Sequence, residues 1–157
     1  MANKMLLIAF DPGKTGGYAT MDTSLATPLI EWGAMPLVGK DFDGRTIRTL
    51  MEDCDKVFIE KVTSFACMGQ FSAFQFGTGW GILQGIAVGL GLSYELVTPK
   101  QWQVMTTGRQ KGAEGKNQSR AMAMQLFPEC AKECKLKSND GIAEAILIAE
   151  YARRNLV

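Results

Sequence analysis

The sequence predicts an α/β fold in which helices pack against a mixed β-sheet. Three extended segments come first and are joined by short turns, which is typical of an antiparallel meander. Helical and strand-like segments then alternate, and this alternation favours parallel strand pairing through crossover helices. With 157 residues, 46% of them hydrophobic, the chain is expected to form a single domain over residues 1–157.

Short apolar runs bounded by turn residues predict the strands. The first run is closed by Asp-Pro-Gly, and Gly16 and Gly17 form a turn into the next extended segment. Each run is too short for a typical helix. The predicted strands are Met5–Phe10, Tyr18–Met21, Pro28–Pro36, Lys56–Val62 and Ser93–Thr98.

Helical spacing of apolar residues predicts helices between and after these strands. They are expected over Arg45–Asp53, the glycine-containing stretch 77–89, a short segment from Lys100, Gln118–Phe127 and Asn139–Arg154. Residues 106–117, rich in Gly and Lys, predict a loop.

Glycine recurs every fourth residue at positions 77, 81, 85 and 89. In a helix these glycines share one face, where they allow another backbone to approach closely. Packing within the chain and contact with a second copy both explain the pattern.

The absence of histidine restricts the possible chemistry. Ser-His-Asp and Cys-His nucleophiles, histidine-ligated zinc and histidine pH switches are all excluded. The apolar stretch 79–92 is shorter than the roughly 20 residues that a membrane-spanning helix needs, so no membrane partner is expected. Four cysteines without a signal sequence favour free thiols and a cytoplasmic location.

Positive charge is concentrated in one segment, although the formal net charge of the chain is only +1. Residues 100–137 hold eight basic and three acidic side chains, a local charge of +5. Clustered Lys and Arg bind nucleic-acid phosphates, and a solvated helix surface is the alternative interpretation. The candidate DNA-binding residues in this segment are Lys100, Arg109, Lys111, Lys116 and Arg120.

Carboxylates stand at the margins of apolar segments. These residues are Asp11, Glu60, Asp140 and Glu144. A buried carboxylate needs a hydrogen-bonding partner, an opposite charge or a metal ion, and carboxylate clusters suit Mg²⁺ or Mn²⁺. Helix capping and ion pairs remain the alternative. Phosphate-loop and dinucleotide spacings fail, so no nucleotide cofactor is expected.

Several segments together carry a family pattern. In chain order they are Ile8–Ala19, Val57–Val62, Val97–Pro99, Lys116–Ser119 followed by Leu126–Glu129, and Asn139–Ala149. The chain resembles the RuvC family of Holliday junction resolvases, with its phage-encoded and chloroplast branches most similar. This resemblance implies a ribonuclease-H-like fold, with a mixed five-stranded sheet and helices on both faces. It also implies a homodimer that makes paired symmetric nicks in four-way DNA junctions during recombination and repair, in a bacterial or phage-infected cell.

The resemblance assigns roles to individual residues. It implies that Asp11, Glu60, Asp140 and Glu144 hold two Mg²⁺ or Mn²⁺ ions per active site, although Glu144 lies one residue beyond the usual spacing. Lys116 matches a lysine that stabilises the transition state, while Lys100 or Lys111 replaces a second family lysine.

An aromatic residue that stacks on opened bases is also expected from the family. Phe65 is the first candidate, with Phe71 and Phe74 as alternatives, and a core position is the competing interpretation for each.

The sequence therefore predicts a metal-dependent endonuclease for branched DNA. Alternatives are a nuclease of the same fold that processes structured RNA and a non-catalytic junction-binding protein. The Asp11-x-Gly13-x-Thr15 turn also occurs in actin-like and sugar kinases, but those proteins need a second domain for which this chain has no room.

Overall fold

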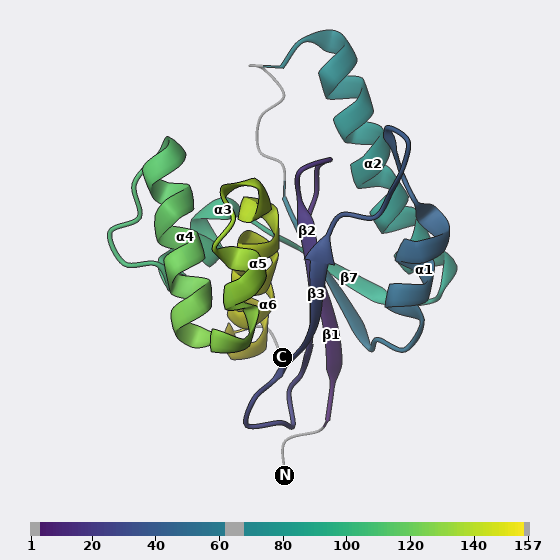
Figure 1. Cartoon of the computed structure of the whole chain (residues 1–157). Coiled ribbons are helices and arrows are strands. Elements are labelled where there is room, and N and C mark those ends of the chain that lie inside the picture. Colours follow the sequence, from purple (N-terminus) through teal and green to yellow (C-terminus); the bar gives the residue numbers. More distant parts are fainter. Residues whose placement is uncertain (1–3, 62–67, 156–157) are drawn as a thin grey trace.

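The computed structural model describes residues 4–61 and 68–155 (Figure 1). Its strands are β1 (Leu6–Asp11), β2 (Gly17–Asp22), β3 (Leu29–Ala34), β4 (Leu37–Val38), β5 (Asp41–Phe42), β6 (Lys56–Glu60) and β7 (Ser93–Val97). Its α-helices are α1 (Gly44–Glu52), α2 (Gln70–Gly89), α3 (Pro99–Trp102), α4 (Gly112–Leu126), α5 (Ala131–Cys134) and α6 (Asp140–Asn155).

The main sheet has five strands in the order β3-β2-β1-β6-β7. Strands β1, β2 and β3 pair antiparallel, whereas β6 pairs parallel with both β1 and β7. This arrangement confirms the predicted mixed sheet. The parallel register brings the carboxyl ends of β1 and β6 to the same edge of the sheet.

Helices cover both faces of the sheet, as predicted (Figure 1). Leu7 and Ala9 face the cluster that contains α6 and α4, whereas Ile8 and Phe10 face the cluster that contains α1 and α2. Alternate residues of a strand point to opposite faces, and all four of these side chains are fully buried. A strand covered on both sides therefore appears in the sequence as a continuous apolar run.

The first turn of α6 lies directly against the turn between β1 and β2. Gly16 and Gly141 form an isolated parallel bridge, and a Cβ atom on Gly141 would overlap the backbone of Thr15 and Gly16. A Cβ on Gly16 would overlap the Asp11 carbonyl group. Glycine at both positions permits this approach, which places Asp140 beside the end of β1.

The structure corrects the predicted loop over residues 106–117, because α4 already begins at Gly112. The glycines in this segment suggested a loop, but Gly115 is a helical residue that allows close packing. A Cβ there would overlap the carbonyl oxygen of Gln110. The short β4–β5 hairpin was not predicted either, since two-residue strands leave little periodic signal.

Of the two interpretations of the glycine stripe, the structure does not support packing within the chain. A Cβ atom built on any of its four members meets no neighbouring atom of the described residues within 4 Å; these glycines are Gly77, Gly81, Gly85 and Gly89. Gly79 is instead the glycine of α2 that packs closely, against the ring of Phe42. The stripe therefore lies on an open face of α2.

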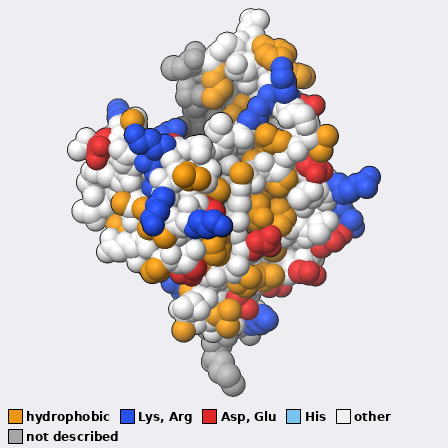
Figure 2. All heavy atoms as spheres, in the orientation of Figure 1, with side chains coloured by type: hydrophobic (Ala, Val, Ile, Leu, Met, Phe, Trp, Pro, Cys, Tyr) orange, Lys and Arg blue, Asp and Glu red, His pale blue; other side chains and the backbone are white. Residues whose placement is uncertain are grey.

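The surface carries separate basic and apolar regions. In Figure 2, Lys and Arg side chains gather over α4 and α5, and another group lies over α1. Exposed apolar side chains on α2 include Phe71, Phe74 and Val88. Within the described ranges, no helix combines the length and apolar character needed to cross a membrane.

Candidate active site

Four carboxylates meet where the carboxyl ends of two parallel strands face the first turn of α6. Asp11 ends β1, Glu60 ends β6, and Asp140 and Glu144 lie one turn apart on α6. Asp11, Asp140 and Glu144 line a pocket of about 210 Å³ together with Lys116. Glu60 is not among the residues that line this pocket, but it lies close enough to Asp11 to raise the pKa of that carboxyl.

Two tryptophans hold Glu60 from opposite faces of the sheet. The indole Nε1–H of Trp102, from α3, donates to Glu60 Oε1 at 2.8 Å. The indole Nε1–H of Trp80, from α2, donates to the Glu60 backbone carbonyl at 3.2 Å. Trp102 is 1% exposed, so its hydrogen bond is shielded from water.

Glu144 is held by an arginine from the loop before α4. Arg109 Nη2 donates to Glu144 Oε1 at 2.9 Å, and Arg109 Nε donates to Ser119 Oγ at 2.9 Å. The guanidinium carbon lies 5.3 Å from the centroid of the Trp102 ring, within cation–π range. Trp102 and Arg109 thereby connect Glu60 with Glu144.

Asp140 contacts two basic side chains of α4. Arg120 donates to Asp140 Oδ1 and also to Asn117 Oδ1. Lys116 Nζ lies 3.5 Å from Asp140 Oδ2, and its side chain is 53% exposed. Lys116 therefore combines proximity to the carboxylates with access from solvent.

Burial and crowding of like charges raise the pKa values of three carboxyls. The pKa of Asp11 lies well above its ordinary value, first because of burial and then because of the nearby Glu60 and Glu144 carboxylates. Burial also raises the pKa of Glu60, against the hydrogen bond from Trp102. Burial raises the pKa of Glu144, against the charge of Arg109. The site thus concentrates negative charge that its basic neighbours only partly balance.

The oxygen atoms of the site are of the chemical type that binds a hard divalent cation. Carboxylate oxygens are the ligands that Mg²⁺ and Mn²⁺ prefer, and a cation would relieve the crowding around Asp11. Within residues 4–61 and 68–155, however, no group of three or more acidic or thiol side chains stands ready to hold an ion. Arg120 and Arg109 engage Asp140 and Glu144, so metal coordination requires these carboxylates to present a different oxygen or to turn.

The expected basic residues divide into two groups. Lys100, Lys111 and Lys116 are exposed, as phosphate contact requires. Arg109 and Arg120 are largely covered, with side chains 13% and 10% exposed, and both pair with site carboxylates. The structure therefore does not give these two arginines the free surface position that the charge pattern suggested.

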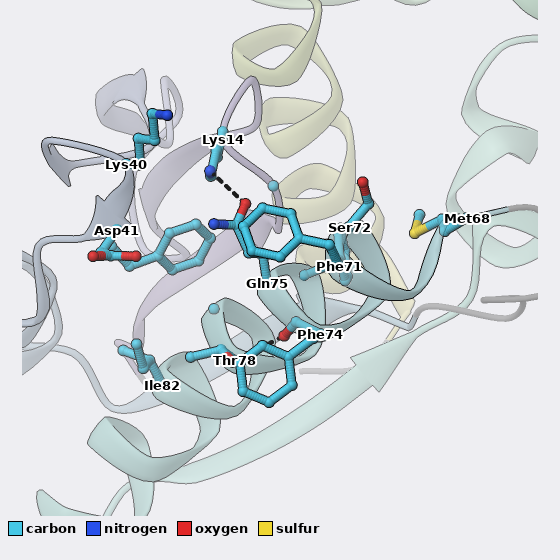
Figure 3. Close-up of a pocket in the computed structure, with 14 residues that line it drawn as sticks. Lys14, Lys40, Asp41, Met68, Phe71, Ser72, Phe74, Gln75, Thr78 and Ile82 are labelled. Carbon is cyan, nitrogen blue, oxygen red and sulfur yellow. Dashed lines mark hydrogen bonds between the residues drawn. The ribbon is translucent and has the colours of Figure 1, made fainter.

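A second cavity, of about 470 Å³, lies on the other side of the β1–β2 turn (Figure 3). Gly13 and Lys14 of this turn line it, whereas Thr15 of the same turn lines the carboxylate pocket. Lys14 Nζ donates to Gln75 Oε1 at 2.8 Å and joins the turn to α2.

Two of the three candidate stacking aromatics line this cavity. Phe71 and Phe74 are each 74% exposed, so neither belongs to the core. In Figure 3 the ring of Phe71 lies beside Gln75, and the ring of Phe74 lies beside Thr78. Phe65 lies outside the described residues.

Sequence reasoning missed two kinds of residue at the site. It did not identify Trp80 and Trp102, whose contacts with Glu60 join positions 20 and 42 residues apart. It placed Lys137 in the basic segment without assigning it to the carboxylate pocket that it lines. An indole N–H usually finds an acceptor when it is buried, but separations of 20 and 42 residues leave no local signal that pairs either tryptophan with Glu60.

Three solved structures superpose on nearly the whole chain. Thermus thermophilus RuvC in complex with a Holliday junction substrate superposes with a TM-score of 0.66 at 12% identity, covering 96% of this chain and 95% of that chain. The structure of Thermus thermophilus RuvC gives 0.63 at 13% identity, covering 96% of each chain. The fowlpox virus Holliday junction resolvase gives 0.67 at 18% identity, covering 98% of this chain and 100% of that chain.

These likenesses confirm the ribonuclease-H-like fold that the sequence resemblance implied. No protein-family model and no curated protein matches the sequence. At these identities the comparison establishes the fold alone, so the activity is argued from the site.

Proposed function

We propose that this protein is a metal-dependent endonuclease that resolves four-way DNA junctions. The observation that carries the proposal is the convergence of four carboxylates, from two adjacent parallel strands and one helix, beside an exposed lysine. Two solved neighbours with this fold support the choice of substrate, since RuvC was solved in complex with a Holliday junction substrate and the fowlpox virus protein is a Holliday junction resolvase.

The four carboxylates would hold Mg²⁺ or Mn²⁺, two ions per site, and such ions would supply activation of water and stabilisation of charge on a phosphodiester. Asp11 and Glu60 are fixed by the sheet, while Asp140 and Glu144 come from the first turns of α6. Lys116 stands beside Asp140 and reaches solvent, so it can contact the scissile phosphate and balance charge that develops there. With no histidine in the chain, this chemistry uses only carboxylates, lysine and metal.

DNA would be bound by exposed basic residues and by the aromatic cavity. Lys100, Lys111 and Lys116 lie in the 100–137 segment, much of which forms the basic surface over α4 and α5 (Figure 2). Phe71 and Phe74 offer exposed rings on which opened bases can stack. The cavity and the carboxylate pocket are lined by neighbouring residues of one turn, so a DNA strand bound at the carboxylates would pass close to the aromatic cavity.

A homodimer would supply the two sites that paired nicks require. The open face of α2 carries the glycine stripe and the exposed Val88, which suit close helix packing against a second copy. Because the glycine stripe does not pack within the described chain, contact with a second copy is the interpretation that remains.

Cleavage of matched substrates tests the proposal. Purified protein is incubated with a synthetic four-way DNA junction, linear duplex of the same sequence and structured RNA, in Mg²⁺, Mn²⁺ or EDTA. We expect metal-dependent nicking of the junction alone. Preferential RNA cleavage supports the RNA-processing alternative.

Tight junction binding without cleavage in either metal supports the non-catalytic alternative. The ion pairs of Arg109 with Glu144 and of Arg120 with Asp140 are the observation that favours that alternative. Binding is therefore measured in the same series by electrophoretic mobility shift in EDTA.

A further inference from the structure

We propose that Trp102 and Arg109 are positioning residues that fix Glu60 and Glu144 as a spaced pair for divalent-cation binding. The inference rests on the proposed function only in taking a divalent cation as the occupant of the carboxylate site. The indole of Trp102 and the guanidinium of Arg109 would orient the metal-binding carboxylates. Neither the charge of the basic segment nor the positions of the acidic residues indicate this role.

The sheet fixes the backbone of Glu60 but not its side-chain carboxylate. Residue 60 is the last of β6, and the Lys61 N–H that follows it still donates to the Val97 carbonyl oxygen at 2.7 Å. The Trp102 indole fixes one side-chain oxygen at 2.8 Å, and the Trp80 indole fixes the backbone carbonyl at 3.2 Å. Together they restrict both the backbone and the carboxylate of one residue.

Arg109 transfers this restraint to the opposite side of the pocket. Its guanidinium stacks on the Trp102 ring at 5.3 Å and donates to Glu144 Oε1 at 2.9 Å. Planar guanidinium groups suit such combined stacking and hydrogen bonding, whereas lysine does not reproduce them. The spacing between the two glutamates is therefore set through a rigid ring and a planar cation.

The two positioning residues are themselves braced. The helix carrying Trp102 begins with a capping box in which Thr98 and Gln101 bond reciprocally, with Pro99 in the first turn. Ser119, which is fully buried, accepts from Arg109 Nε at 2.9 Å. Gly115 leaves room for the backbone beside Arg109, because a Cβ there would overlap the carbonyl of Gln110.

The hydrogen bonds leave coordination capacity at both glutamates. Trp102 uses Oε1 of Glu60, and Arg109 uses Oε1 of Glu144. A carboxylate offers about four lone-pair sites on two oxygens, so both side chains retain acceptor capacity, although Glu60 also hydrogen-bonds with the Asp11 carboxyl. Hydrogen bonds to ligating carboxylates orient them, and loss of such partners typically weakens metal affinity 10–100-fold.

Trp102→Phe removes the indole N–H and keeps an aromatic ring for Arg109. Isothermal titration calorimetry of the full chain with Mn²⁺ should show a dissociation constant raised about tenfold or more. In junction cleavage, kcat at low Mn²⁺ should fall while KM for the junction is unchanged. Saturating Mn²⁺ should restore kcat, which a general folding defect would not allow.

Trp32→Phe is the matched control. Trp32 Nε1 donates to Glu133 Oε2 at 3.1 Å, so this variant also deletes an indole–carboxylate hydrogen bond, but outside the site. It should bind Mn²⁺ as the unmodified protein does. Unchanged Mn²⁺ affinity in a folded Trp102→Phe variant overturns the inference.

Arg109→Lys provides a second test if Trp102→Phe does not fold. It keeps the positive charge and loses the fork that joins Ser119 to Glu144, so Mn²⁺ binding should again weaken about tenfold. Unmodified affinity in this folded variant also contradicts the inference. A different result would contradict the proposed function and leave this inference standing. In that case the unmodified protein binds Mn²⁺ but does not cut junctions, and the variants bind Mn²⁺ more weakly.

Discussion

Gly16 and Gly141 lie backbone to backbone, in a bridge that joins the β1–β2 turn to the first turn of α6. Each glycine occupies a position where a Cβ atom would overlap the opposing or local backbone. Asp140 immediately precedes Gly141, and Asp11 lies at the start of the turn that contains Gly16. This contact therefore fixes the distance between the strand carboxylates and the helix carboxylates.

Gly141→Ala should destabilise the fold and separate the two halves of the site. The added methyl group overlaps Thr15 and Gly16, and overpacking of this kind costs about 1–3 kcal/mol. Urea unfolding monitored by circular dichroism measures the loss. Gly81→Ala is the control, since its methyl group meets no atom within 4 Å in the described part of the chain and alanine favours a helix by up to about 1 kcal/mol. Equal effects of the two variants would contradict the account of Gly141.

Asp11→Asn should stabilise the metal-free protein, increasingly so at higher pH. The pKa of Asp11 is raised in the folded state, so its contribution to stability is complete below the ordinary carboxyl pKa near 4 and is lost as pH rises through the raised value. Asparagine does not ionise, so the variant does not lose this stability as the pH rises. Tm in EDTA, measured between about pH 4 and 8, should show a gap that widens with pH.

The surface variant Asp53→Asn controls for loss of one negative charge in that series, because Asp53 is exposed at the end of α1. A Tm gap between Asp11→Asn and the unmodified protein that is constant with pH would show that burial and the neighbouring carboxylates do not raise the pKa of Asp11.

Lys116→Ala and Lys111→Ala should have different kinetic effects. Lys116 lies beside Asp140, so its removal should lower kcat about a hundredfold with little change in KM. Lys111 is exposed just before α4, so its removal should weaken junction binding and reduce the salt-dependence slope by about one. Steady-state kinetics and binding at several salt concentrations separate the effects. The same kinetic effect from both variants would argue against a special role for Lys116.

Val88→Glu should disrupt the proposed dimer. Val88 is 65% exposed on α2, and a charge there would be buried against the second copy. Light scattering should report a monomer, and cruciform plasmid should yield nicked circles instead of linear product. Leu25→Glu, at an exposed apolar residue before β3, is the control and should remain dimeric. A dimeric Val88→Glu variant would place the interface elsewhere.

The sheet and its acidic residues could be predicted because their signals are local. The run before Asp11 is apolar throughout since β1 is covered on both faces, and the same reasoning found β6 and Glu60. The spacing of Asp140 and Glu144 placed both on one face of a helix.

The supports of the site could not be predicted, because they depend on contacts between distant segments. The bond from Trp102 to Glu60 spans 42 residues, and that from Arg109 to Glu144 spans 35. Gly115 suggested a loop by composition, although it serves close packing inside α4. Charge clustering likewise could not distinguish the exposed Lys116 from the covered Arg120.

The central claim is that one carboxylate site cuts four-way junctions with the help of divalent metal. It is tested most directly by mapping nicks on an end-labelled junction with the unmodified protein and with Asp11→Asn, in Mg²⁺ and Mn²⁺. The account predicts paired symmetric nicks from the unmodified protein, and junction binding without cleavage from Asp11→Asn. Nicking by Asp11→Asn at the unmodified rate would contradict it.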